Sequence, residues 1–287
     1  MKTLFLTSAA LLLLAGCEQT GVNDVKAQAA PDTKAAEKVI KPVKSSKKMG
    51  AEDIGNRGEV MMAIQAHGRL KKDLELDALR KPDPVLEFTG IWPGMTVVEL
   101  EAGTGYYTDL LNTIVGKEGK VYMQNPPAFD SLLTAEKMDP RLGKDGKRLA
   151  NTEVLRTEFG ALGLADNSAD MVTWFLGPHE MFYTVEGTNG MGDAQGPYSE
   201  AFRVLKPGGK FIVMDHKAAP GTPESSGGDT HRIDPATVRA RAEKAGFTLL
   251  KTSDIHANKN DDYSLNIFNP KVRRKTDRFL HMYVKPK

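Results

Sequence analysis

One segment, residues 95–108, constrains the fold of this chain more than any other. A β-branched apolar run ends at the carboxylate of Glu99, and a turn with Gly103 and Gly105 follows it. Residues 106–115 then carry apolar side chains at helical spacing. A strand, a glycine turn and a helix in this order let the backbone approach a nucleotide-like ligand, because a Cβ would hold the ligand away. The segment therefore predicts a ligand-binding turn with Glu99 as a hydrogen-bond acceptor, although a plain tight turn can use the same glycines.

Strand and helix patterns alternate along the rest of the chain. Strands are predicted at residues 96–98, 119–124, 153–157, 171–175, 210–215, 247–252 and 279–284. Helices are predicted at 54–72, 84–88, 106–115, 130–137, in a segment ending near 205, and at 234–245, with loops at 140–148, 187–196 and 220–229. Alternation of this kind predicts an α/β fold with a doubly wound, mostly parallel sheet. A chain of 287 residues with 40% apolar residues can bury one sizeable core of this type or two small ones.

Several segments resemble, in order, the motifs of class I S-adenosylmethionine (SAM)-dependent methyltransferases. The glycine turn is similar to the family's first motif, with Glu101 at the first glycine position and Gly103 and Gly105 at the other two. The helix, Lys-Pro-Gly-Gly turn and strand at 201–215 form the most specific match. The resemblance runs from about residue 80 to the C-terminus and is closest to a bacterial branch of exported predicted methyltransferases, whose acceptor is not defined. It implies a Rossmann-like sheet of seven strands with an antiparallel late strand, and SAM as cofactor.

The same resemblance implies a set of cofactor contacts. Asn125 stands where the family usually has an acid that holds the ribose hydroxyls, and Glu158 and Phe159 fall where the family contacts adenine. Glu101 has two interpretations: it points to solvent, or it places a second carboxylate near the sulfonium. Glu99 is predicted to contact the ribose hydroxyls, although a carboxylate that only caps the turn would explain it as well. The full predicted set is Glu99, Glu101, Gly103, Gly105, Asn125, Glu158 and Phe159.

Polar side chains at the ends of two predicted strands are candidates for acceptor chemistry. His179 follows the fourth strand, Asp215 and His216 end the fifth, and His231 comes after the next loop. Open α/β sheets bind ligands at the carboxyl edge of their strands, and an imidazole can serve as a base near neutral pH. Each histidine alone is as easily structural as functional. A metal site formed by Asp215, His216, His231 and His179 is conceivable, but no compact ligand spacing supports it, so no metal is predicted.

The N-terminus predicts an export signal. Lys2 precedes an apolar run that is too short to span a membrane, and residues 1–16 have the pattern of a signal peptide. Leu-Ala-Gly-Cys at 14–17 resembles the bacterial lipoprotein box, in which the cysteine is acylated and becomes the new N-terminus. Cys17 is the only cysteine of the chain, so the folded domain contains no disulfide.

The residues after Cys17 predict the domain organisation and the location. Residues 17–50 contain no aromatic side chain and indicate a flexible, lipid-anchored tether, whereas residues 51–287 form the methyltransferase-like domain. Such a chain faces the periplasm from the bacterial envelope. Glu18 replaces the aspartate that retains many lipoproteins at the inner membrane, which favours the outer membrane.

Charge and location leave three functions to compare. A net charge of +2 argues against nucleic-acid binding, so the expected partners are the membrane and a small-molecule or envelope substrate. SAM is made in the cytoplasm, however, whereas the export signal sends this chain out of the cytoplasm. A lipid-anchored binding protein that keeps the methyltransferase fold without catalysis is therefore the alternative. A nicotinamide-dependent oxidoreductase is disfavoured, because its fingerprint has a glycine or alanine where Thr108 stands.

Overall fold

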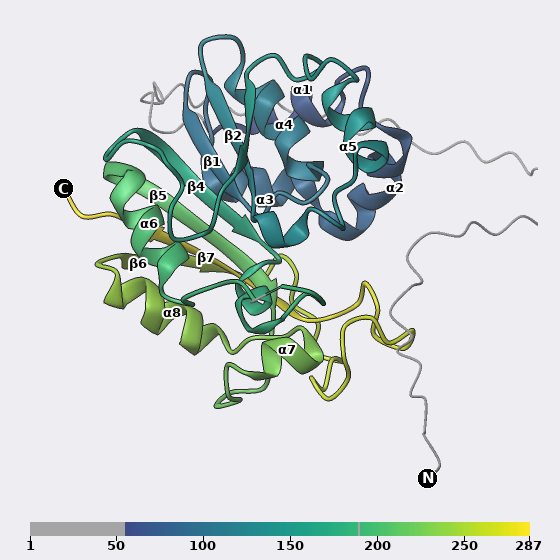
Figure 1. The fold of residues 1–287 in the computed structure, drawn as a ribbon, viewed down its shortest axis with the longest axis vertical. Helices are drawn as coiled ribbons and strands as arrows, with labels where there is room; N and C mark the ends of the chain where they lie inside the picture. The colour runs from purple at the N-terminus through teal and green to yellow at the C-terminus, as the bar shows by residue number, and fades with distance from the viewer. Residues whose placement is uncertain (1–54, 189) are drawn as a thin grey trace, which may run out of the picture. The chain divides into compact units, whose positions relative to one another are not determined.

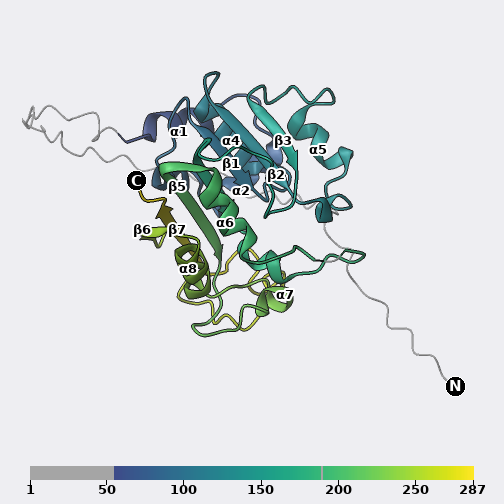
Figure 2. The same ribbon diagram turned by 60° about the vertical axis from the view of Figure 1, so that its left-hand side comes forward.

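The computed structural model describes residues 55–188 and 190–287 (Figures 1 and 2). The predicted signal peptide, Cys17, the tether and residues 51–54 lie outside the described residues. Within the described part of the chain, no helix combines the length and the apolar character needed to cross a membrane.

A seven-stranded sheet forms the centre of the domain. Its strands stand in the order β3 (Thr152–Arg156), β2 (Lys120–Asn125), β1 (Thr96–Leu100), β4 (Ala169–Phe175), β5 (Leu205–His216), β7 (Arg278–Val284) and β6 (Thr248–Ser253). The pairs from β3 to β5 are parallel, and β7 is antiparallel to both of its neighbours. The structure thus confirms the doubly wound, mostly parallel sheet with an antiparallel late strand.

Helices pack on both faces of this sheet (Figures 1 and 2). The sheet separates the core into two apolar clusters. One cluster holds side chains of α1 (Arg57–Ile64), α3 (Pro82–Thr89) and α4 (Tyr106–Val115). The other holds side chains of α6 (Gly196–Val204) and α8 (Pro235–Lys244). Val97 and Val98 of β1 belong to opposite clusters, because successive side chains of a strand point to opposite faces. Each side chain buried in this way contributes roughly 1.5–3 kcal/mol.

Most predicted elements are found, and the first helix is the clearest error. The single helix predicted at 54–72 is wrong: α1 ends at Ile64, and α2 (Lys71–Arg80) begins after a connection that contains Gly68. Gly68 has a φ of 91°, a left-handed conformation that interrupts a helix and suits glycine. The apolar pattern therefore continued across a point at which the helix is interrupted.

The helix predicted at 130–137 lies later in the chain. A short 3₁₀ turn, η1 (Pro127–Phe129), comes first, and α5 (Ala135–Leu142) follows and takes in Pro140, which was predicted as loop. The predicted loop at 220–229 likewise ends in a short helix, α7 (Ser226–Thr230). In contrast, the N-cap predicted for α8 is confirmed, since Asp234 accepts a hydrogen bond from the amide of Ala236 at 2.9 Å.

The prediction that the Lys-Pro-Gly-Gly segment forms a turn before the fifth strand is wrong. β5 begins at Leu205, so the segment lies inside the strand and not in a turn before it. Its pairing with β4 shifts register between Ala169 and Met171, and Gly208 has a φ of 81°. A strand accommodates such extra residues as a bulge, which glycine favours.

A buried ion network ties the helices to the glycine turn. The Arg141 side chain is fully buried and lies 2.5 Å from a carboxylate oxygen of Asp73 on α2 and 2.5 Å from one of Asp109 on α4. Its Nε also donates to the carbonyl of Thr104, inside the glycine turn, at 2.9 Å. Arg148 adds a second cation on Asp109 at 2.9 Å. A buried charge set of this kind is stable only while every member keeps its partners.

Replacing Arg141 tests this dependence. Arg141→Met leaves the carboxylates of Asp73 and Asp109 without their buried partner, so the free energy of unfolding should fall by about 3–5 kcal/mol. Guanidinium unfolding followed by circular dichroism measures the change. Arg239→Met is the control, because Arg239 pairs with Glu243 on the exposed side of α8 and should change stability little. Equal losses in the two variants would contradict a structural role for Arg141.

Candidate functional site

The turn between β1 and α4 has the backbone that its glycines predict. Glu101, Gly103 and Gly105 all have positive φ, at 52°, 57° and 79°. A Cβ on Gly105 would lie about 3 Å from the side chains of Met123, Thr108 and Arg141, so glycine is required there. A Cβ on Gly103 would meet no atom within 4 Å, which leaves that side of the turn open. Glu101 thus keeps the left-handed backbone usual for glycine, at a cost of about 1–2 kcal/mol.

Glu99 lies beneath this turn and not on its surface. Its side chain is 3% exposed, and Thr108 Oγ1 donates to its Oε2 at 2.5 Å. Burial raises the pKa of Glu99 to about 7 and outweighs the opposing effects of Thr108 and the two nearby arginines. The carboxyl group is therefore poised between its neutral and ionised forms near neutral pH. Its contact with ribose stays a prediction.

Glu101 turns its carboxyl group toward β4. Trp174 Nε1 donates to Glu101 Oε2 at 3.0 Å. Gly177 makes room for this hydrogen bond, because a Cβ there would lie 2.2 Å from Glu101 Oε2 and 2.1 Å from Trp174 Nε1. Burial raises the pKa of Glu101 well above its ordinary value, and the charge of Glu180 acts in the same direction. Of the two interpretations of Glu101, the solvent-facing one is not what the structure shows.

Amide side chains at the end of β2 hold the backbone of the turn. Asn125 Oδ1 accepts from the amide of Gly103 at 2.8 Å, and its Nδ2 donates to the carbonyl of the same residue at 3.2 Å. Gln124 Oε1 accepts from the amide of Glu101 at 3.0 Å. Asn125 therefore has a structural task that the sequence did not reveal, and its ribose contact stays a prediction.

The residues predicted to contact adenine lie after β3. Phe159 is buried against Trp174, with ring centroids 5.6 Å apart, whereas Glu158 is exposed. Their contact with adenine stays a prediction.

The four residues predicted for acceptor chemistry lie together at the carboxyl edge of the sheet. His179 is in the 3₁₀ turn η2 (Pro178–Phe182) after β4, and its Nδ1 lies 2.7 Å from Oδ1 of Asp215, at the end of β5. The ring centroid of His179 lies 5.9 Å from that of His216 and 5.3 Å from that of His231. All four residues are buried. The structure confirms their proximity, and their chemical roles stay predictions.

The histidines of this cluster differ sharply in electrostatics. Burial acts to lower the pKa of His179, but the carboxylates of Asp215 and Glu180 outweigh it and raise the pKa to about 10. Burial lowers the pKa of His216 well below its usual value, and its Nδ1 lies 2.6 Å from Thr276 Oγ1. One imidazole is thus held charged by acidic neighbours and the other is held neutral.

Glu180 is the residue of this cluster that the sequence analysis missed. Its Oε1 lies 3.2 Å from His179 Nε2 and 3.4 Å from His231 Nδ1. Burial would raise the pKa of Glu180, yet the two histidines lower it to about 2. The adjacent His-Glu pair directly after the fourth strand was the one available signal, because both residues leave the same strand end.

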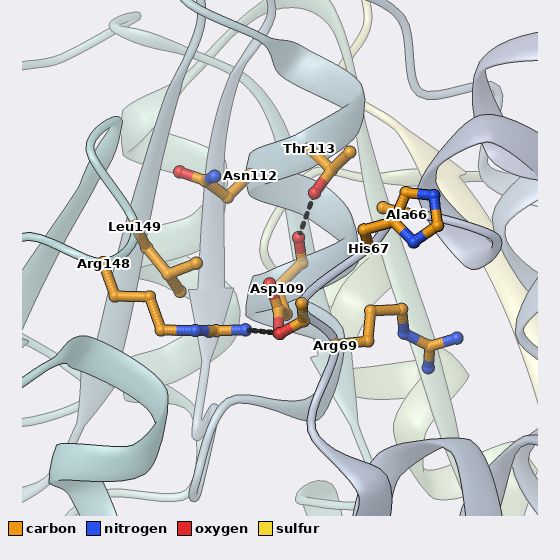
Figure 3. A pocket seen from close by; sticks show the side chains of 9 residues that line it. Ala66, His67, Arg69, Asp109, Asn112, Thr113, Arg148 and Leu149 are labelled. Carbon is orange, nitrogen blue, oxygen red and sulfur yellow. Dashed lines mark hydrogen bonds and ion pairs between the residues drawn. The ribbon is translucent and has the colours of Figure 1, made fainter.

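A surface cavity of the described part of the chain lies apart from this edge. Its volume is about 330 Å³, and it borders α4 on the side of the α1–α2 connection (Figure 3). Its two arginines are already paired, Arg148 with Asp109 and Arg69 with Asp77. It contains no residue of the glycine turn or of the histidine cluster, so it is not the candidate site.

Comparison with solved structures identifies the fold. The chain is similar to a SAM-dependent methyltransferase from Aquifex aeolicus, with a TM-score of 0.52, 22% identity and coverage of 75% of this chain and 97% of that one. It is also similar to Haemonchus contortus phosphoethanolamine N-methyltransferase 2, solved with S-adenosylhomocysteine, with a TM-score of 0.54, 13% identity and coverage of 82% and 61%. The fold is that of SAM-dependent methyltransferases.

Residues 73–221, just over half of the chain, match the model of the ubiE/COQ5 methyltransferase family, and the chain belongs to that family. It is 28% identical over 134 residues to the ubiquinone/menaquinone biosynthesis C-methyltransferase UbiE of Klebsiella pneumoniae. That match covers 45% of this chain and 46% of the relative, so the chain spans about half the length of the relatives it matches.

The raised pKa of Glu99 predicts a pH-dependent stability. Because the folded pKa of about 7 exceeds the ordinary value of 4.5, the folded state binds the extra proton between these values, and stability falls as pH rises through this window. Glu99→Gln removes the free-energy cost of ionising a buried carboxyl group. It should therefore be more stable than the wild type by about 3 kcal/mol near pH 8 and equal to it below about pH 4.5. Urea unfolding at both pH values measures the difference, with the exposed Glu118→Gln as control. A constant difference across the window would contradict the assignment.

Proposed function

We propose that this chain binds SAM at the turn between β1 and α4 and transfers its methyl group to a small-molecule or envelope acceptor. The observation that carries the proposal is the turn itself, which holds three left-handed residues and is open at Gly103, in a chain of a methyltransferase family. When bound, SAM supplies a methyl group on a positively charged sulfonium. The protein contributes binding, orientation and exclusion of water.

The residues of the turn and its surroundings would form the cofactor side. Gly103 allows close approach, and Glu101 provides a partly buried acid between the turn and β4. The set also includes Glu99, Gly105, Asn125, Glu158 and Phe159 as predicted from the sequence. The acceptor side would be the cluster of His179, Asp215, His216 and His231. His179 follows β4, the neighbour of β1 in the sheet, and Asp215 and His216 end β5, the neighbour of β4. Both sides therefore occupy the edge where open α/β sheets bind ligands.

Binding measurements on the full chain test the cofactor assignment. Isothermal titration should show binding of SAM and S-adenosylhomocysteine, and none of NAD. A hydrogen bond to a charged group is worth roughly 1.5–3 kcal/mol, so Glu99→Ala should weaken SAM binding by about ten- to a hundredfold at a pH above 7. Glu118→Ala is the control, because Glu118 is exposed beside Lys117.

Two results would contradict this assignment. Unchanged affinity in a folded Glu99→Ala variant would place the ribose elsewhere. A wild-type chain that binds neither SAM nor S-adenosylhomocysteine would favour the alternative of a lipid-anchored binding protein without catalysis.

We further propose that the protein is exported and held at the envelope by lipid on Cys17. The Leu-Ala-Gly-Cys box after a short apolar run supports this proposal, together with the tether at 17–50. The domain would then face the periplasm, with the outer membrane favoured by Glu18. An acceptor in the envelope would lie within reach of a domain tethered in this way.

The lipid anchor predicts a defined N-terminal peptide. Mass spectrometry of the mature protein from its native host should show a peptide that begins at an acylated Cys17. Cys17→Ser should block acylation and leave the signal peptide uncleaved by the lipoprotein route. Density separation of inner and outer membranes reports the final location. An intact Met1 or an unmodified Cys17 in the wild type would overturn the proposal.

A further inference from the structure

Three side chains from two distant segments converge next to Asp215. They are His179 and Glu180 of η2 and His231, the residue that follows α7. A nitrogen of each imidazole and a Glu180 oxygen lie within 4.8 Å of one another. The nitrogens closest to Glu180 Oε1 are Nε2 of His179 and Nδ1 of His231. Both nitrogens are buried and have no hydrogen-bond partner, although each lies within 3.5 Å of the same oxygen. These contacts therefore lack hydrogen-bond geometry. A metal ion can bind both nitrogens once it displaces the proton that the acidic neighbours favour on His179 in the metal-free protein.

The spacing of these atoms fits a metal ion. In a tetrahedral zinc site, nitrogen and oxygen ligands about 2.0–2.1 Å from the ion are about 3.3–3.4 Å from each other. The two distances from Glu180 Oε1, 3.2 Å to His179 and 3.4 Å to His231, match this value. Two imidazoles and one carboxylate are also a ligand set that zinc enzymes use, with a fourth position left open.

Asp215 holds the His179 imidazole in the orientation that such a site needs. Its Oδ1 lies 2.7 Å from Nδ1 of His179, and its Oδ2 accepts the backbone amide of the same residue at 2.8 Å. A carboxylate on one ring nitrogen fixes the tautomer and leaves the other nitrogen available as a ligand. Among the described residues, no lysine or arginine forms an ion pair with Asp215, Glu180 or Glu101. Buried carboxylates without such a partner favour a bound cation.

The glycines of α7 bring His231 into this position. A Cβ on Gly227 or Gly228 would lie 2.4 Å from the carbonyl oxygen of His179 or of Phe182. The backbone of α7 can therefore rest directly on η2. Figures 1 and 2 show α7 near the carboxyl end of β5. His231 itself has a φ of 54°, at a helix end where glycine is usual. Strain of this kind persists where the surroundings require the particular side chain.

We propose that His179, Glu180 and His231 bind a divalent transition metal ion such as Zn²⁺, with Asp215 as the residue that positions His179. Imidazole ligands suit zinc, copper, iron and nickel better than magnesium or calcium. The open position accepts water, or a hydroxyl or thiol group of an acceptor, and a bound metal makes such a group easier to deprotonate. The sequence predicted no metal site because His231 is far along the chain from the His179–Glu180 pair.

Zinc binding by the full chain tests this proposal without SAM. After removal of metals with EDTA, titration with zinc chloride against a chromophoric chelator should show one site per chain. Glu180→Gln and His231→Gln should weaken zinc binding by more than about a hundredfold. Asp215→Asn, which changes only the residue that orients His179, should weaken it by about 10–100-fold. His256→Gln is the matched control, because His256 is also buried with an unpartnered Nε2 but lies outside the cluster.

A readout on the wild type covers the case in which a variant does not fold. Zinc should raise the thermal unfolding temperature of the metal-free wild type, because a ligand that binds the folded state stabilises it. Absence of a stoichiometric zinc site, or equal zinc affinity in Glu180→Gln and His256→Gln, would overturn the proposal. A chain that binds zinc but not SAM would instead contradict only the proposed methyltransferase function.

Discussion

The buried guanidinium of Arg141 is the group on which the cofactor side of this domain depends. No solvent reaches it, so its N–H groups must find acceptors within the protein. Asp73 and Asp109 provide them from two helices, and the carbonyl of Thr104 provides another from the glycine turn. One cation thus fixes α2, α4, α5 and the turn relative to each other. A turn with three left-handed residues keeps its conformation because its surroundings hold it in this way.

A second constraint connects the turn to the histidine cluster. The carboxyl group of Glu101 meets the indole of Trp174 only because residue 177 has no side chain. From Gly177 the chain continues directly into η2, which carries His179 and Glu180. The predicted cofactor side and the polar cluster are therefore neighbours along one edge of the sheet. If the cluster holds a metal, its charge would act on the carboxyl group of Glu101, the residue after β1, which already responds to the charge of Glu180. The two sites would then influence each other's occupancy.

Local sequence patterns predicted the elements that depend on interactions between residues close together in the chain. The helix at 106–115 and the cap at Asp234 follow from apolar spacing and from side chain to backbone hydrogen bonds within a few residues. Patterns failed where a tertiary contact or a single backbone conformation decided the outcome. Gly68 broke a continuous apolar pattern into two helices, and pairing with β4 drew the Lys-Pro-Gly-Gly segment into β5. The acidic and basic residues of the Arg141 network carried no local signal, because its members lie on three separate helices.

The sequence by itself determined the order of strands and helices, the glycine turn and the edge of the sheet at which polar residues gather. The physical reason is that parallel strands joined by helices must end on the same edge, so His179 and Asp215 had to lie near it. Only the tertiary structure decided which atoms meet there. Asn125 binds the backbone of Gly103, and Glu180 lies between His179 and His231, because these contacts join segments far apart in the chain. Such distances depend on how α7 packs against η2, and no spacing in the sequence encodes that packing.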